Sequence, residues 1–178
     1  AHSATSGNDA HSATSGDYAH SATSGNRANS ATSGYGAHSA TSGYGAHSAT
    51  SGDYAHSATS GNRANSATSG NDAHSATSGD YAHSATSGNR ANSATSGYGA
   101  HSATSTSDAI ACAVGRKAKA KAAKGSWIVL AEWHEGGSWE DAHPLAIKSA
   151  QVDGKVIKAD QWYKLVDGEF VETDDSNE

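Results

Sequence analysis

The histidines of this chain recur at a spacing that could place them side by side. Nine of the eleven histidines occupy the same position of a nine-residue unit: His2, His11, His20, His38, His47, His56, His74, His83 and His101. Stacked units would align these imidazoles on one face, where they could bind a transition metal or a repetitive ligand. Solvent-exposed polar positions are the plainer interpretation. We treat the column as a candidate binding face and expect no metal and no cofactor.

Asparagine replaces histidine in three units, at Asn29, Asn65 and Asn92. Each asparagine comes two residues after an arginine that ends the preceding unit. The exchange could keep a protonatable imidazole away from a guanidinium. It could equally record duplication, because the order of the variable residue pairs in the first four units recurs later in the array.

The hydroxyls suggest a second chemistry. Each unit contains Ser-Ala-Thr-Ser, and ice-binding solenoids display threonines at alternate positions of flat strands. Ice binding is therefore an alternative hypothesis if the threonines face outward.

The last third of the chain contains residue types suited to acid–base or metal chemistry: Glu132, His134, Glu135, Glu140, Asp141 and His143. Their spacing matches no zinc motif such as His-Glu-x-x-His, and they flank a Gly-Gly loop. We therefore expect no enzyme. Trp127, Trp133, Trp139 and Trp162 could bind a glycan, which makes ligand binding in this segment a further alternative, although such residues more often form a small core.

The unit Ala-His-Ser-Ala-Thr-Ser-Gly-x-x recurs twelve times between residues 1 and 108. Strict repetition is typical of a repeat architecture. Gly with Asn, Asp or Tyr supplies a turn, and the six residues between turns suit a short strand. Nine residues are too few for a full coil, so we predict a thin all-β solenoid of nine-residue half-turns. Two nearly equivalent half-turns should make one coil.

The phase of the period predicts which side chains face inward. The unit that begins at Ala118 places Lys119 and Lys121 at positions 2 and 4, and lysine belongs in solvent. Positions 2, 4 and 6 (His, Ala, Ser) should therefore face outward. Positions 1, 3 and 5 (Ala, Ser, Thr) should face inward, with hydroxyls bonded between coils or to backbone.

Composition separates the chain into two parts. All four tryptophans and every Val, Leu and Ile lie beyond residue 108. We predict a repeat domain over residues 1–125 and a β-rich capping module over residues 126–178. The net charge of −6 is divided equally at residue 108, which argues against a nucleic acid partner. No apolar run is long enough to span a membrane.

The segment after the repeats should close the solenoid. Ile110, Cys112 and Val114 occupy outward positions, so we expect the strand 127–133 to cover them and Cys112 to be a small buried hydrophobe. The basic stretch 116–124 should be a solvated edge. Further strands are expected at 145–152, at 155–158 through an Asp153-Gly154 hairpin, and at 169–172, with a strand or short helix at 161–166. A frayed acidic tail should follow from Thr173.

The Ser-Ala-Thr-Ser-Gly units together with Trp-Ile-Val-Leu-Ala-Glu-Trp and Asp-Gln-Trp-Tyr-Lys-Leu-Val-Asp-Gly resemble repeat proteins of gut bacteria and their phages. A weaker similarity exists to the head repeats of trimeric autotransporter adhesins, from which the nine-residue period departs. The resemblance implies an extracellular or virion-associated location. Our hypothesis is a non-enzymatic structural or binding protein, part of a phage or cell-surface appendage, whose partner is a repetitive or multivalent surface. A homo-oligomer remains open.

Overall fold

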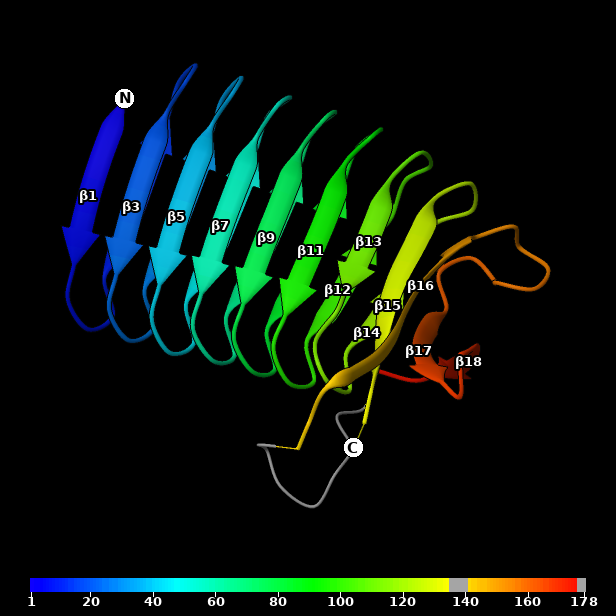
Figure 1. Cartoon of the computed structure of the whole chain (residues 1–178). Helices are drawn as coiled ribbons and strands as arrows, with labels where there is room; N and C mark the ends of the chain where they lie inside the picture. The colour runs from blue at the N-terminus through cyan, green and yellow to red at the C-terminus, as the bar shows by residue number, and fades with distance from the viewer. Residues whose placement is uncertain (135–140, 176–178) are drawn as a thin grey trace.

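The computed structural model describes residues 1–134 and 141–175, and this part of the chain forms a β-solenoid (Figure 1). Sheet A has nine strands in the order β1-β3-β5-β7-β9-β11-β13-β15-β16, and sheet B has nine in the order β18-β17-β14-β12-β10-β8-β6-β4-β2. Successive repeat strands alternate between the sheets, and His2 pairs with His20 in parallel register. The structure confirms the predicted all-β solenoid with two nine-residue units per coil.

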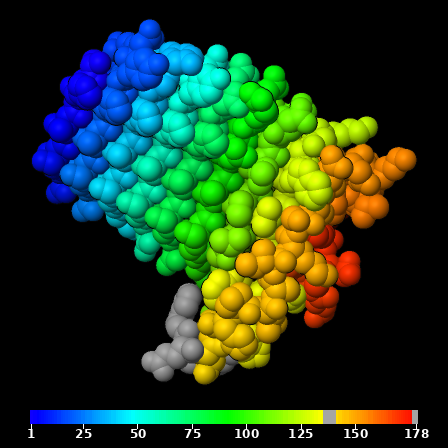
Figure 2. Space-filling view, turned by 45° about the horizontal axis from the view of Figure 1, so that its top comes forward, coloured from blue at the N-terminus to red at the C-terminus, as the bar shows by residue number. Residues whose placement is uncertain are grey.

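The repeat strands are β1 (His2–Ser6), β2 (His11–Ser15), β3 (His20–Ser24), β4 (Asn29–Ser33), β5 (His38–Ser42), β6 (His47–Ser51), β7 (His56–Ser60), β8 (Asn65–Ser69), β9 (His74–Ser78), β10 (His83–Ser87), β11 (Asn92–Ser96) and β12 (His101–Thr104). The closing strands are β13 (Ile110–Ala113), β14 (Lys119–Lys121), β15 (Trp127–Trp133), β16 (Pro144–Gln151), β17 (Trp162–Val166) and β18 (Glu169–Thr173). Space-filling atoms show the coils as parallel bands that end at the cap (Figure 2).

Alternation along each strand gives the solenoid an interior of small side chains. In the unit that begins at Ala37, Ala37, Ser39 and Thr41 are buried. His38, Ala40 and Ser42 are exposed in the same unit. The predicted orientation is therefore confirmed. Small inward residues let the two sheets approach closely, which is how a chain without large apolar side chains in its repeats still packs densely.

The inward serines form one continuous chain of hydroxyl hydrogen bonds. Each serine donates to the serine of the preceding unit, on the opposite sheet, at 2.7–2.9 Å, from Ser102 back to Ser3. Hydroxyls linked in series polarise one another, so each bond strengthens its neighbours. The chain joins the two sheets through the centre of the solenoid, as expected for the serines.

The threonines behave differently from the prediction. The Oγ1 atoms of ten buried threonines have no hydrogen-bond partner within the described chain: Thr14, Thr23, Thr32, Thr41, Thr50, Thr59, Thr68, Thr77, Thr95 and Thr104. A buried hydroxyl without a partner costs about 1–3 kcal/mol of desolvation. The threonine column therefore contributes packing through its methyl groups and opposes folding through its hydroxyls.

Glycine occupies position 7 in every repeat unit except the twelfth, which has Thr106, and two features of the turns favour it. Gly43 has a φ of 134°, a region that L side chains rarely adopt. A Cβ atom at Gly43 would also lie 2.0 Å from the carbonyl oxygen of Gly25, one coil earlier. From Gly25 to Gly97 the stacked turns therefore leave no room for a Cβ atom at position 7, and the glycine column allows the tight stacking of the coils.

The parallel coils end where one unit is a residue short. Trp127 pairs with Ile110, one residue less than the two-unit separation of the earlier coils, and fully buried Ser126 takes the place of the inward alanine. Both sheets then continue with antiparallel strands, β16 beside β15 and β17 beside β14. Their inner side chains, among them Ile128, Leu130 and Tyr163, form an apolar core with the last alanines of the solenoid.

The strand 127–133 does not cover the apolar groups of β13. It pairs edge to edge with β13 and extends sheet A, so Ile110 and Trp127 remain 42% and 44% exposed. Cys112 is half-buried beside them rather than buried, and this burial raises the pKa of its thiol. The expected cover was wrong because, without β15, the edge of β13 would be unpaired. Pairing with β15 satisfies the backbone groups of that edge.

The lysines that indicated the phase are covered, although the phase itself is right. Lys119 is 8% exposed, and its Nζ donates to the carbonyl oxygen of Asp174 at 3.0 Å. The Nζ of Lys121 lies 4.6 Å from the ring centroid of Trp162. The centre of the basic stretch is therefore not solvated, whereas Lys117 and Lys124 are exposed. Residues 174–175 of the tail dock on the solenoid; residues 176–178 lie outside the described chain.

The predicted hairpin at Asp153-Gly154 is wrong. Residues 155–158 form no strand, because Oδ1 of Asp153 accepts the backbone N–H groups of Lys155, Val156 and Ile157. These bonds fold the segment into a turn, lower the pKa of Asp153 and place Ile157 in the core. The other three predicted strands of the cap are present as β16, β17 and β18.

Candidate binding surfaces

Folding divides the predicted histidine column between the two sheets. Sheet A carries an uninterrupted run on β1, β3, β5, β7 and β9, formed by His2, His20, His38, His56 and His74. Neighbouring rings in this run, which we call the histidine ladder, stack at centroid distances of 4.8–5.1 Å with interplanar angles of 3–12°. The ladder ends at Asn92, whose Nδ2 lies 3.3 Å from Nδ1 of His74.

Sheet B breaks its histidines apart. Asn29 lies between His11 and His47, and Asn65 lies between His47 and His83. The amides of Asn29 and Asn65 donate to the carbonyl oxygens of Arg27 and Arg63 at 2.8 and 3.2 Å. The asparagines therefore hold the preceding turn.

One of the nine predicted histidines is not on an open face. His101 is 1% exposed, its ring lies 5.0 Å from that of Trp162, and its Nδ1 is 3.1 Å from Oδ1 of Asp175. Burial and the neighbouring His83 lower the pKa of His101, while Asp175 opposes this shift. The docked tail removes His101 from the candidate face.

Two imidazoles of the ladder, those of His20 and His56, have a lowered pKa. Partial removal from water, followed by the charges of His38 and His2, lowers the pKa of His20. The same cause, with His38 and His74 as neighbours, lowers the pKa of His56. His20 and His56 therefore favour the neutral form, because burial and the adjacent imidazoles both oppose the charged form.

The ladder geometry does not converge on a metal ion. Among the described residues, no group of three or more His, Cys, Asp or Glu side chains is placed to hold one. Rings stacked in parallel direct their nitrogens side by side rather than toward a common point. The ladder instead forms a continuous aromatic surface along sheet A.

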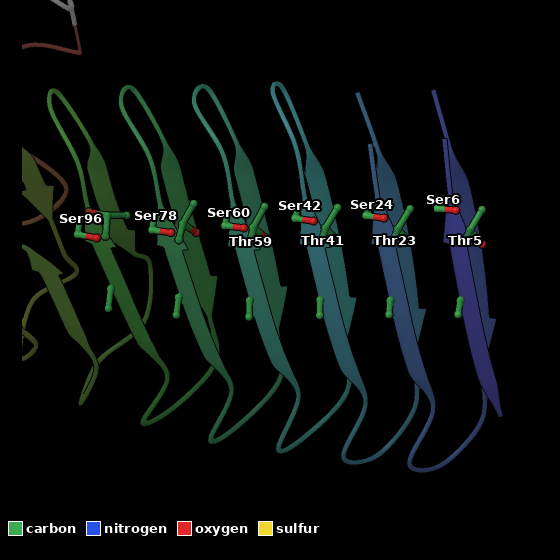
Figure 3. A pocket seen from close by; sticks show the side chains of 18 of the residues that line it. Thr5, Ser6, Thr23, Ser24, Thr41, Ser42, Thr59, Ser60, Ser78 and Ser96 are labelled. Atoms are coloured by element: carbon green, nitrogen blue, oxygen red, sulfur yellow. The ribbon is translucent and has the colours of Figure 1, made fainter. Parts of the chain in front are cut away.

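Each sheet presents a long open groove beside its outward alanines. On sheet A the groove runs along the alanine and serine columns from Ala4 and Ser6 to Cys112, with a volume of about 780 Å³ (Figure 3). The histidine ladder borders the alanine column on its other side. Sheet B has a similar groove. The two faces present the same small side chains at every coil.

The two edges formed by the turns differ in charge, a difference that we did not expect from the sequence. Turns after odd-numbered units lie at the lower edge of Figure 1, and turns after even-numbered units lie at the upper edge. The lower edge, here called the arginine edge, carries Arg27, Arg63, Arg116 and Lys117 with Asp9 and Asp80. The upper edge, here called the aspartate edge, carries Asp17, Asp53, Asp72 and Asp108 with Arg90 and Lys124.

Counting these turn residues gives +2 for the arginine edge (four cations, two acids) and −2 for the aspartate edge (two cations, four acids). The variable pairs show no simple alternation along the chain, so the difference emerges when units are sorted by parity. The predicted equivalence of the half-turns holds for their backbone and not for their charge.

Among the described residues, the acid–base candidates of the last third form no group of three or more that could hold a metal ion. Both oxygens of the Glu132 carboxylate accept backbone N–H groups, from Asp167 at 2.7 Å and Gly168 at 2.8 Å. The rings of His134 and His143 lie 5.1 Å apart, and Nδ1 of His143 is 2.8 Å from the carbonyl oxygen of Asp141. Glu135 and Glu140 lie outside the described residues.

Two of the tryptophans serve the structure. Trp133 Nε1 donates to the carbonyl oxygen of Val114 at 3.0 Å, and Trp162 packs on His101 and Lys121. Trp127 is exposed on the outer face of sheet A, and Trp139 lies outside the described residues.

Comparison with protein-family models, with curated protein sequences and with solved structures finds no match for this chain. Within residues 1–134 and 141–175, no helix is long and apolar enough to cross a membrane.

Proposed function

We propose that the chain is a non-enzymatic structural and binding repeat protein, a rigid rod that presents the same groups at every coil to a repetitive partner. The observation that supports this is the register. Every repeat strand pairs in parallel with its neighbour at equivalent positions, as His38 does with His56 and Ser42 with Ser60. Outward groups therefore recur about every 4.8 Å along straight lines.

A periodic surface gains affinity from multivalency. Each contact with a repetitive partner is weak, but contacts at successive coils act together at a high effective concentration. Such a rod fits a phage or cell-surface appendage, the setting that the sequence resemblance suggests.

The test compares polymers with their own short fragments. The intact chain is titrated with an acidic polysaccharide, a neutral polysaccharide and DNA, each as a polymer and as a short oligomer. We expect at least one polymer to bind more tightly, per repeat, than its oligomer. Deletion of residues 64–81, one full coil, should weaken that binding while circular dichroism stays β-rich. Failure of every polymer to bind more tightly than its oligomer would refute the proposal.

Ice binding is a second candidate function, and the exposed alanine and serine columns are the feature that favours it. The threonines face inward, so an ice-binding surface would have to use outward groups such as Ala40, Ser42 and Ser60. An ice-recrystallisation assay decides: activity that disappears in Ser42→Lys/Ser60→Lys would support this candidate.

A further inference from the structure

The arginines at the same position of the unit have different partners on the two edges. Arg90, on the aspartate edge, forms an ion pair with Asp72 at 3.0 Å. Arg27 and Arg63, on the arginine edge, are exposed and form no ion pair with any described residue. A guanidinium is neutralised on one edge and left available on the other.

The acids of the arginine edge do not cancel this charge. Oδ1 of Asp80 accepts the backbone N–H of Tyr98 at 3.0 Å, so this carboxylate supports the next turn. Asp9 lies in the first turn, at the end of the row. The centre of the edge is therefore positive at neutral pH, independent of any histidine.

Tyrosines alternate with these cations along the same edge. The guanidinium of Arg63 lies 6.0 Å from the ring centroid of Tyr44. Arg116 and Lys117 lie 5.9 and 5.6 Å from the ring centroid of Tyr98, which itself packs against Tyr81. Cation–π contacts of this kind hold flexible cations in a fixed row. The edge thus offers aromatic surface and positive charge in turn.

The spacing of the cations selects the ligand. Arg27 and Arg63 are two coils apart, or about 10 Å, and Arg63 and Arg116 are three coils apart, or about 14 Å. A nucleic acid carries a charge on every nucleotide and would meet more phosphates than this row has cations, in a chain whose net charge is −6. A polysaccharide with one carboxylate per disaccharide carries its charges at wide intervals and has apolar sugar faces that pack on tyrosine.

We propose that the arginine edge binds a linear acidic polysaccharide with one carboxylate per disaccharide, its carboxylates on Arg27 and Arg63 and its sugar rings on the tyrosines of the same edge. A guanidinium binds a carboxylate in a bidentate geometry, which gives the row directional contacts. This proposal rests on the proposed function and names the partner of one edge.

The test uses hyaluronan oligosaccharides and the intact chain, with binding measured by calorimetry at low and at physiological salt. Wild type should bind, and binding should weaken as salt rises because the contacts are exposed. Arg27→Asn and Arg63→Asn should each weaken binding about fivefold, the upper range for an exposed ion pair. Asparagine is chosen because it tolerates the positive φ of these positions, 55° and 58°.

Arg90→Asn is the matched control, with the same change of charge at the same position of the unit on the other edge. It should leave hyaluronan binding unchanged. Methyl-esterified hyaluronan, which keeps the sugars and loses the carboxylates, should not bind. Circular dichroism of every variant should match wild type.

Four results would overturn the proposal: no binding of hyaluronan by wild type, equal loss from Arg90→Asn and Arg63→Asn, equal binding of the esterified polymer, or tighter binding of single-stranded DNA. If hyaluronan fails while another polymer binds through a different surface, the periodic-display function stands and the assignment of this edge falls.

Discussion

At the residue scale, the interior places two hydroxyl columns in the same environment with opposite effects. Ser39 donates to Ser30 and accepts from Ser48, both at 2.8 Å. Thr41, two residues on in the same strand, is as deeply buried, and its Oγ1 has no partner within the described chain. Position in the strand, and not residue class, decides whether a hydroxyl stabilises this fold.

This contrast gives the first stability prediction. Thr41→Val removes an unpartnered hydroxyl and keeps the branched shape, so the free energy of unfolding should rise by about 1 kcal/mol. Ser39→Ala interrupts the serine chain and leaves Ser48 without its acceptor, so the same quantity should fall by about 2 kcal/mol. Urea denaturation of both variants beside wild type measures the difference. A loss of stability in Thr41→Val would show that the threonine hydroxyl has a stabilising partner.

At the scale of the element, the histidine ladder stacks one imidazole from each of five strands. The pKa of His20 and of His56 is lowered in the folded chain, so the unfolded chain binds more protons below its ordinary value of about 6.5. The stability contributed by neutral rings is therefore complete above about pH 6.5 and is lost as the pH falls through the lowered folded-state values.

Thermal melting against pH tests this linkage. The melting temperature should fall between about pH 7.5 and pH 5, and His20→Asn/His56→Asn should reduce that fall because it separates the remaining imidazoles. The control is His11→Asn/His47→Asn on sheet B, where asparagine already lies between the histidines. An identical pH dependence in the two double variants would mean that stacking in the ladder plays no part.

At the scale of the whole molecule, the odd or even number of a repeat unit determines the sheet in which its strand lies and the edge at which its turn lies. Units of the same parity are neighbours in space, and units of opposite parity share only the interior. Every repeat unit presents the same inward residues, so moving a unit from an odd to an even position leaves the interior unchanged. The same move changes which side chains are neighbours on the faces and at the edges.

Two deletions separate these properties. Removal of residues 37–45, one unit, and of residues 37–54, two units, should both leave a folded solenoid, because stability in repeat proteins is roughly a sum over neighbours. The one-unit deletion joins His20 to His47 and cuts the longest histidine run from five to three, while the two-unit deletion leaves a run of four.

The measured consequence of these deletions is the pH dependence of melting. It should weaken more in the one-unit deletion, even though that variant retains more residues. The one-unit deletion also moves Arg27 to the edge opposite Arg63. If the pH dependence of melting instead weakens in proportion to the number of residues removed, the arrangement of odd and even units on the surface does not control it.

Most of the repeat fold could be predicted from single residues. Glycine at position 7 and the residue pair after it mark the turns, and alternation along Ser-Ala-Thr determines the inward and outward sets. The cap was harder, because competing local interactions decided it: Asp153 bonds three backbone N–H groups and prevents the predicted hairpin. Burial of Lys119 depended on Asp174 of the tail, which is distant in the sequence.

The sequence by itself determined the period, the strand and turn chemistry, the small-residue interior and the change of composition near residue 108, because these follow from local conformational preference and side-chain size. The tertiary structure decided which repeated residues become neighbours. Because the coil closes after every second unit, His2 lies beside His20 and not beside His11. This closure turns one histidine column into a ladder and an interrupted row, and divides the turn charges between an arginine edge and an aspartate edge.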